Sequence, residues 1–271
     1  NPPYYAGSHI LDLIAPKGNN LECAEVPVKT NFEEETPVTD GIAWKNELIE
    51  QQKMAYEICK MKDPDKIIIL GGDCSVEQAP FDYLHGKYPE NTAVIWIDAH
   101  PDFSRPADCP NEHAMVLGNL MGDGAPEFAD MVKHPFRKED VIYVGLAADH
   151  METWEEEYQK EYQIKYLTPQ QLDKNSDALL SWIQENGYQQ VLIHWDLDVL
   201  SPDDFRSLLC AKPHIPPVSY AVGQMTLDQV IRILKDISGI VNVAALGITE
   251  FLPWDIMRFQ KKLGELDIFK K

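Results

Sequence analysis

The chain has 271 residues, of which 44% are hydrophobic and 25% are charged, and this apolar content excludes a wholly disordered protein. Its 24 Lys and Arg against 44 Asp and Glu leave a net charge of −20, which argues against nucleic-acid and membrane partners and favours a small cationic or neutral ligand. We find no long apolar stretch and no export signal, and the 5 scattered cysteines do not form a disulfide framework, so we expect a cytoplasmic protein.

Helical and extended patterns alternate along the chain from residue 42 onward. Residues 1–41 are rich in proline and predict loops around a short helix near residues 10–13. The spacing of apolar residues predicts helices at residues 42–61, 80–85, 115–121, 151–162, 168–186 and 227–237. Apolar runs without alternation predict strands covered on both faces at residues 66–70, 93–97, 141–145, 191–195 and 241–248. This order predicts one doubly wound α/β sheet in a single domain, residues 1–271.

Polar side chains that could bind a metal follow four of the predicted strands. In chain order they are Cys74, then Asp98, His100 and Asp102, then Asp196 and Asp198, and finally Glu250. The carboxyl ends of parallel strands meet at one edge of a sheet, so we expect these side chains to converge there. Clustered carboxylates repel one another unless cations lie among them, and hard divalent cations accept oxygen and imidazole ligands. The sequence therefore predicts a metal site at this edge.

Three segments in this order resemble motifs of the arginase/agmatinase (ureohydrolase) family. Residues 71–75 (GGDCS) are similar to its G-G-D-H-S, residues 98–102 (DAHPD) to its D-A-H-x-D, and residues 194–202 (HWDLDVLSP) to its S-x-D-x-D-x-x-D-P. Glu250 and His113 match the family's late glutamate and flexible-loop histidine. The resemblance implies a three-layer α/β/α fold with a mostly parallel sheet, homo-oligomers (trimers or hexamers), and a two-manganese site that hydrolyses a guanidino group to urea.

The resemblance also implies roles for individual residues. One metal would bind Asp98, His100, Asp196 and Asp198, and the other would bind Asp98, Asp102, Asp196 and Cys74. A metal-activated hydroxide, oriented by Asp102, would attack the guanidinium carbon. Glu250 would hold the guanidinium by charge-assisted hydrogen bonds, and His113 would carry protons to the leaving amine. Ser104 and Asn111 occupy positions at which arginases contact the amino-acid head of arginine.

The main departure from the family pattern is Cys74, where a histidine is expected. A thiolate prefers Zn²⁺ or Fe²⁺ to Mn²⁺, and it leaves the cluster with an excess negative charge. We therefore predict one or two ions, with fewer than two Mn²⁺ per chain, although Cys74 as a buried hydrophobe facing away from the metal remains an alternative. His194 replaces the family's serine and has the opposite phase from Trp195, which favours packing over metal binding.

Three functions remain open on these residues. The first is a metal-dependent hydrolase of a linear guanidino or amidino compound; arginine is not assigned as its substrate, because Arg105 and Glu112 are foreign to the arginase pattern. The second is a single-metal deacylase of the same fold, in which Asp98, His100 and Asp196 would hold the ion. The third is a catalytically silent relative kept for binding or assembly.

Overall fold

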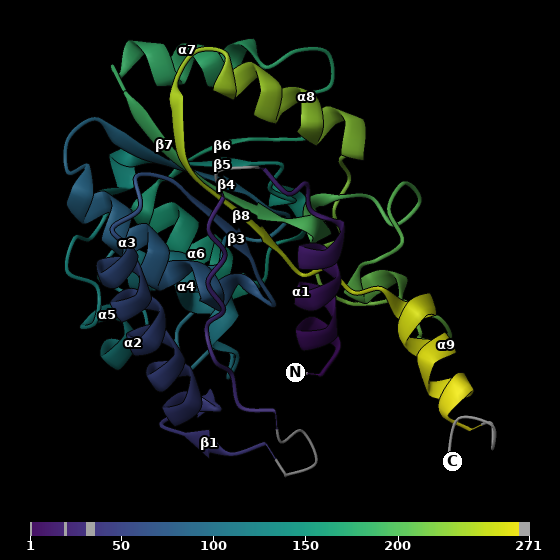
Figure 1. Cartoon of the computed structure of the whole chain (residues 1–271). Helices are drawn as coiled ribbons and strands as arrows, with labels where there is room; N and C mark the ends of the chain where they lie inside the picture. The colour runs from purple at the N-terminus through teal and green to yellow at the C-terminus, as the bar shows by residue number, and fades with distance from the viewer. Residues whose placement is uncertain (1, 19–20, 31–35, 266–271) are drawn as a thin grey trace.

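The computed structural model describes residues 2–18, 21–30 and 36–265, and a six-stranded sheet runs through its centre (Figure 1). The strands lie in the order β3-β8-β7-β4-β5-β6, and every neighbouring pair is parallel. Their bounds are β3 Ile67–Leu70, β4 Thr92–Ile97, β5 Val141–Val144, β6 Lys165–Leu167, β7 Gln190–Asp196 and β8 Asn242–Thr249. A separate antiparallel pair is formed by β1 (Val38–Thr39) and β2 (Ile42–Ala43).

Helices cover both faces of the sheet, as Figure 1 shows, with α7 and α8 on one face and α3, α4 and α6 on the other. The arrangement confirms the predicted three-layer α/β/α fold. The helices are α1 Pro2–Ile14, α2 Lys45–Lys62, α3 Gln78–Lys87, α4 Val116–Leu120, α5 Pro126–Ala129, α6 Thr153–Tyr162, α7 Asp177–Glu185, α8 Leu227–Ser238 and α9 Trp254–Gly264. Among these described helices, none has the length and hydropathy that crossing a bilayer requires.

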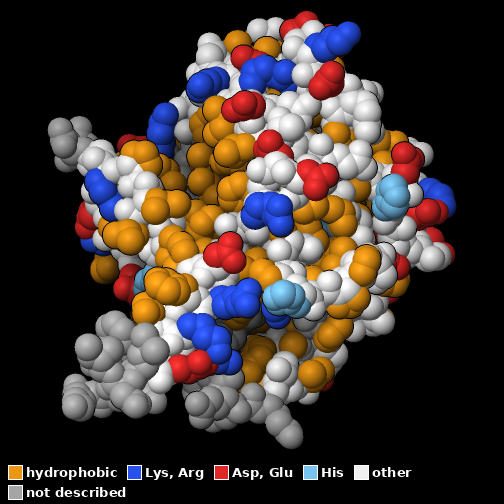
Figure 2. Space-filling view, turned by 90° about the vertical axis from the view of Figure 1, so that its right-hand side faces the viewer, with side chains coloured by type: hydrophobic (Ala, Val, Ile, Leu, Met, Phe, Trp, Pro, Cys, Tyr) orange, Lys and Arg blue, Asp and Glu red, His pale blue; other side chains and the backbone are white. Residues whose placement is uncertain are grey.

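The surface on the side of α1 and α9 is less uniformly acidic than the net charge suggests. Figure 2 shows hydrophobic side chains spread between acidic and basic groups on this face. Leu13 and Ile14 near the end of α1, and Ile256 and Phe259 on α9, are large exposed hydrophobic side chains. One concentration of negative charge lies inside the protein, as described below.

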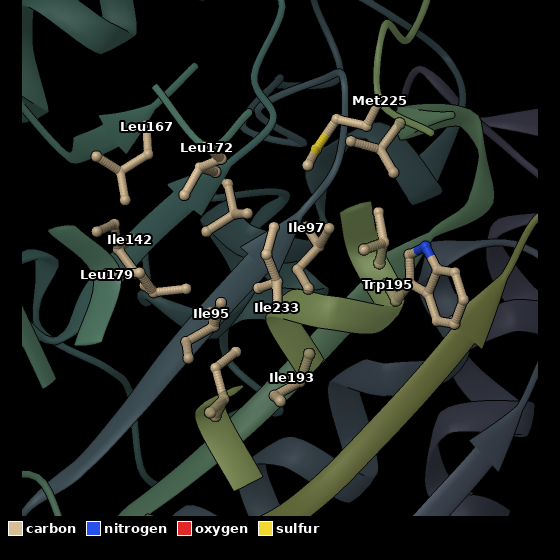
Figure 3. Close-up of a cluster of buried hydrophobic side chains, with 14 of the residues drawn as sticks. Ile95, Ile97, Ile142, Leu167, Leu172, Leu179, Ile193, Trp195, Met225 and Ile233 are labelled. Atoms are coloured by element: carbon tan, nitrogen blue, oxygen red, sulfur yellow. The ribbon is translucent and has the colours of Figure 1, made fainter. Parts of the chain in front are cut away.

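The central strands are apolar on both sides because both sides are covered. All six residues of β4 are buried. Ile95 and Ile97 face the α7 and α8 layer, where they belong to one hydrophobic cluster with Leu179 and Ile233 (Figure 3). Trp96 points to the opposite layer and belongs to the cluster formed with α3 and α4. This double burial explains why the strand pattern lacks alternation.

The structure differs from the predicted helices mainly after α6. Residues 165–167 form the edge strand β6, residues 168–176 form turns, and α7 begins only at Asp177. The Gln171 side chain accepts a hydrogen bond from the Thr168 amide, and this local contact replaces a helical turn. The predicted helix at 168–186 was therefore too long, although Leu172 is fully buried. Helices α5 and α9 were not predicted, and the short helix near residues 10–13 extends over Pro2–Ile14.

The strand order reverses between β4 and β7. After β4 the chain continues outward to β5 and β6, whereas after β7 it continues in the opposite direction to β8. In doubly wound sheets, ligands bind at the carboxyl ends of the strands where this reversal occurs. The polar residues predicted to bind a metal follow β3, β4, β7 and β8, which are the four neighbouring strands around that point.

Candidate metal centre

The carboxyl ends of four strands bring the predicted acidic residues together. Asp98 belongs to two groups of side chains whose ligand atoms all lie within 4.8 Å of one another. We call Cys74, Asp98, Asp102 and His194 the inner group, and Asp98, His100 and Asp198 the outer group. A third set joins Cys74 and Asp196 to Glu250. The metal ligands predicted from the sequence thus converge, and His194 joins them.

The inner group is closed to solvent and the outer group is partly open. Cys74, Asp98 and His194 are at most 2% exposed, whereas the His100 side chain is 22% exposed and that of Asp198 is 15% exposed. Any ligand from solvent would therefore reach the centre from the side of His100 and Asp198.

Backbone and side-chain hydrogen bonds hold the carboxylates in place. Asp98 Oδ1 accepts from the His100 amide at 2.7 Å, and Asp98 Oδ2 accepts from Trp96 Nε1 at 3.1 Å. Asp196 Oδ1 accepts from the Asp198 amide at 2.7 Å, and Asp196 Oδ2 accepts from Cys74 Sγ at 3.0 Å. The thiol of Cys74 therefore faces the carboxylates rather than away from them.

Two residues of the centre adopt the left-handed backbone conformation that favours glycine. Asp102 has φ of 46° and Glu250 has φ of 61°. For a residue with a side chain this conformation is strained, and such strain concentrates at functional sites. At Glu250 the surrounding fold maintains it, because the Glu250 amide donates to the Gly72 carbonyl at 2.7 Å.

The clustered charges raise the pKa of some carboxyl groups of the centre and lower that of another. Burial, together with the neighbouring acids Asp98 for Asp102 and Asp198 for Glu250, raises the pKa of both carboxyls well above their usual range. Burial alone would also raise the pKa of Asp98, but the neighbouring His100 and His194 imidazoles outweigh it and hold this pKa below its usual range. Much of the negative charge is therefore uncompensated, and protons or a metal cation must neutralise it.

Several buried polar atoms of the centre have no hydrogen-bond partner among the described residues. They are Asp102 Oδ2, Asp198 Oδ1 and His194 Nε2. An unpaired buried polar atom costs about 1–3 kcal/mol, so such atoms call for a ligand. Carboxylate oxygens and an imidazole nitrogen are donors for divalent cations, and the residues present therefore fit a metal ion.

The remaining predicted residues lie around this centre rather than in it. His113 Nδ1 is 3.9 Å from Asp73 Oδ2, and the His113 side chain is 31% exposed. Ser104 is buried and accepts a hydrogen bond from Trp154 Nε1 at 3.2 Å, whereas Asn111 is exposed. Within the described parts of the chain, no hydrogen bond or ion pair joins the Ser104 or Asn111 side chain to the carboxylates.

Helix α1 contributes a residue that the sequence analysis did not consider. The buried Tyr4 hydroxyl hydrogen-bonds to the Glu250 carboxyl, and burial and the charge of Glu250 raise the pKa of Tyr4, so the hydroxyl stays protonated and donates. The helix reaches this position because Gly7 packs directly on the Phe251 carbonyl, where a Cβ atom would overlap with the oxygen. No motif links Tyr4 to Glu250, and only the fold brings them together.

A buried acid beside the centre predicts a pH-dependent stability. Glu112 accepts from Asn119 Nδ2 at 2.8 Å, while burial and the charge of Asp73 raise its pKa from 4.5 to about 8. Between these values the folded state holds a proton that the unfolded state has lost, so the free energy of unfolding falls as pH rises, by up to about 1.4 kcal/mol per pH unit.

We expect Glu112→Gln to remove this dependence and to be more stable than the parent at pH 9. Urea unfolding of both proteins at pH 6 and pH 9 measures the effect, with the exposed Glu161→Gln as control. Equal losses of stability in parent and Glu112→Gln between the two pH values would contradict the prediction.

Comparison with known proteins agrees with the fold. A family model described as the arginase family matches residues 19–255. An arginase of Staphylococcus aureus strain MSSA476 is 26% identical over 187 residues, which cover 66% of this chain and 61% of that protein. Among solved structures, the arginase of Bacillus caldovelox is similar with a TM-score of 0.70 and 20% identity, covering 84% of this chain and 76% of that chain. Entamoeba histolytica arginase in complex with L-ornithine gives a TM-score of 0.67 at 20% identity, with coverages of 83% and 76%.

These similarities have a limited extent. The matched segments span 56–64% of the length of the first staphylococcal relatives. At 20% identity, the likeness to the two solved structures concerns the fold.

Proposed function

Because the chain belongs to the arginase family, we propose that it is a metal-dependent hydrolase that cleaves a linear carbon–nitrogen bond of a guanidino or amidino compound. The observation that carries the proposal is the convergence of Asp98, Asp102, Asp196, Asp198 and Glu250 at one sheet edge, with buried oxygen atoms left unpaired. A site with this much negative charge favours a cation as ligand and, beside it, a cationic substrate.

The outer group and Asp196 would hold one divalent ion, and Asp98, Asp102 and Asp196 with Cys74 would hold a second. When bound, such an ion lowers the pKa of water towards neutrality and stabilises developing negative charge. Mn²⁺ suits the oxygen-rich outer ligands, whereas the Cys74 sulfur favours Zn²⁺ or Fe²⁺.

The residues that bind and orient the substrate would act around the metal ligands. Glu250 presents a carboxylate that can accept paired hydrogen bonds from a planar guanidinium, which is the geometry that makes such pairs strong. The unpaired Oδ2 of Asp102 is available to accept a hydrogen bond from the attacking water. His113, partly exposed and close to Asp73, would deliver a proton to the leaving amine.

The open side of the centre sets the direction from which the substrate arrives. We assign Ser104 and Asn111 to the far end of the substrate, as the family pattern implies. Ser104 would have to exchange its contact with Trp154 for one with the substrate. We further propose a cytoplasmic homo-oligomer, a trimer or hexamer, on the same family grounds.

Release of urea or ammonia tests the proposal directly. The full chain is incubated separately with Mn²⁺, Zn²⁺ and Fe²⁺, and with linear guanidino compounds that carry or lack an amino-acid head, such as arginine and agmatine. We expect metal-dependent turnover of at least one compound, unchanged in the exposed control Asp130→Asn. A folded, metal-loaded protein that releases neither product from any compound would refute the function.

A second candidate function rests on the outer group alone. The single-metal deacylase was predicted to hold its ion with Asp98, His100 and Asp196, without Cys74. Asp98 and His100 lie together in the outer group, where Asp198 is the third member. Acetate released from acetylated polyamines by a protein that releases no urea or ammonia would favour this alternative.

A further inference from the structure

We infer that His194 is a metal ligand, and that with Cys74, Asp98 and Asp102 it forms an inner site for a borderline-soft divalent ion such as Zn²⁺. The inference rests on the proposed metal centre but not on the proposed substrate. It assigns an imidazole ligand, in place of Asp196, to the half of the centre in which Cys74 replaces the expected histidine.

The position of His194 on β7 directs its ring into the centre. His194 lies two residues before Asp196, so both side chains point to the same face of the sheet. The ring is fully buried and stacks on Trp96, with ring centroids 3.7 Å apart and planes inclined by 20°. Its Nε2 lies 3.5 Å from Asp98 Oδ2 without forming a hydrogen bond. The prediction that His194 packs was therefore incomplete, because one nitrogen faces the acidic residues.

A second carboxylate determines which nitrogen is free. His194 Nδ1 lies 2.8 Å from Glu77 Oε2, and Glu77 is also fully buried. A carboxylate that accepts the Nδ1 proton leaves the lone pair on Nε2, which is how metal-binding histidines are commonly oriented. Gly247 on β8 makes room for this partner, because a Cβ at that position would overlap with Glu77 Oε1. Glu77 is thus a positioning residue for His194.

The four donor atoms are close enough together to bind one ion. They lie within 4.8 Å of one another, and the ligands of a tetrahedral Zn²⁺ lie roughly 3.5 Å apart, so a small contraction would complete the site. A thiolate and an imidazole favour Zn²⁺, whereas His100 and Asp198 with Asp98 form a harder site. The centre would then hold two unlike ions that share Asp98.

Cobalt titration of the full chain tests the inference without relying on activity. Co²⁺ bound to a thiolate has a charge-transfer band in the near ultraviolet, and tetrahedral coordination intensifies its visible bands. We expect both signals in the parent, and we expect the charge-transfer band to be lost in Cys74→Ser. His194→Gln should weaken binding at the inner site by more than about 100-fold, and Glu77→Gln by about 10- to 100-fold. His100→Gln is the matched control, because it alters the outer group and should leave the thiolate band in place.

Each outcome decides a different point. Circular dichroism of the metal-free variants establishes that they fold, and Glu77→Gln provides the same test if His194→Gln does not fold. Unchanged cobalt affinity and visible intensity in these variants would overturn the inference and leave His194 as a buried partner of Asp98 and Glu77. Loss of inner-site binding in a protein that hydrolyses no guanidino compound would support the inference and refute the proposed function.

Discussion

Replacing Asp98 with asparagine is expected to reduce metal binding at both the inner and the outer group and to lower hydrolysis by about 10³-fold or more. Asp98 is the residue that the two groups share, so its charge is lost from both. Several kcal/mol of metal-derived stabilisation of the transition state would disappear with the ions, and about 1.4 kcal/mol corresponds to a factor of ten in rate.

The measurement is metal content by elemental analysis together with turnover at saturating metal. Asp98 Oδ2 accepts from Trp96 Nε1, and Asp98 Oδ1 accepts from the His100 amide. An asparagine has only one oxygen, so its NH₂ group would face one of these two donors and that hydrogen bond would be lost. We therefore expect a loss of stability of about 1–3 kcal/mol as well, and only folded protein is compared. Asp130→Asn is the control for a lost surface charge. Parent-like metal content in Asp98→Asn would show that the ions bind elsewhere.

Replacing Glu250 with glutamine is expected to lower kcat/KM for a guanidino substrate by roughly 10- to 150-fold. The change removes a charge-assisted interaction worth about 1.5–3 kcal/mol while it keeps the size of the side chain. Glu250 is within 4.8 Å of Cys74 and Asp196, so its role as a substrate partner must be separated from a role as a metal ligand.

Metal affinity provides that separation. If Glu250 binds the guanidinium, Glu250→Gln keeps the metal affinity of the parent and loses turnover. A parallel loss of metal affinity would instead make Glu250 a ligand, and unchanged kinetics would exclude both roles. Glu161→Gln on the exposed side of α6 is the charge-matched control.

The parts of the fold that the sequence predicts well are those in which local pattern and burial agree. The residues of β4 are apolar without interruption because helices cover both of its faces, and this strand was predicted almost to its ends. The edge strand β6 was missed because Lys165 and Tyr166 are exposed and only Leu167 is buried, which leaves almost no hydrophobic pattern. Its existence depends on pairing with β5, a contact that no local pattern encodes.

Some residues of the candidate site could likewise be predicted from the sequence, and others could not. Residues at strand ends, such as Asp98 and Asp196, could be placed together because parallel strands end at one edge. For His194 the available signal was its two-residue spacing from Asp196, but its partner Glu77 lies 117 residues earlier in the chain. The orientation of the imidazole therefore follows from tertiary packing and could not be obtained from either segment alone.

The contact between Tyr4 and Glu250 links ligand binding at Glu250 to the packing of α1, which is far from Glu250 in the sequence. A ligand that pairs with this carboxylate has to displace the Tyr4 hydroxyl, and the helix that carries Tyr4 packs tightly against Phe251 at Gly7. A bulkier residue at position 7 would overlap with the Phe251 carbonyl, and we expect it to displace the Tyr4 hydroxyl from the Glu250 carboxylate. The selectivity of the site for its ligand therefore depends partly on how α1 packs.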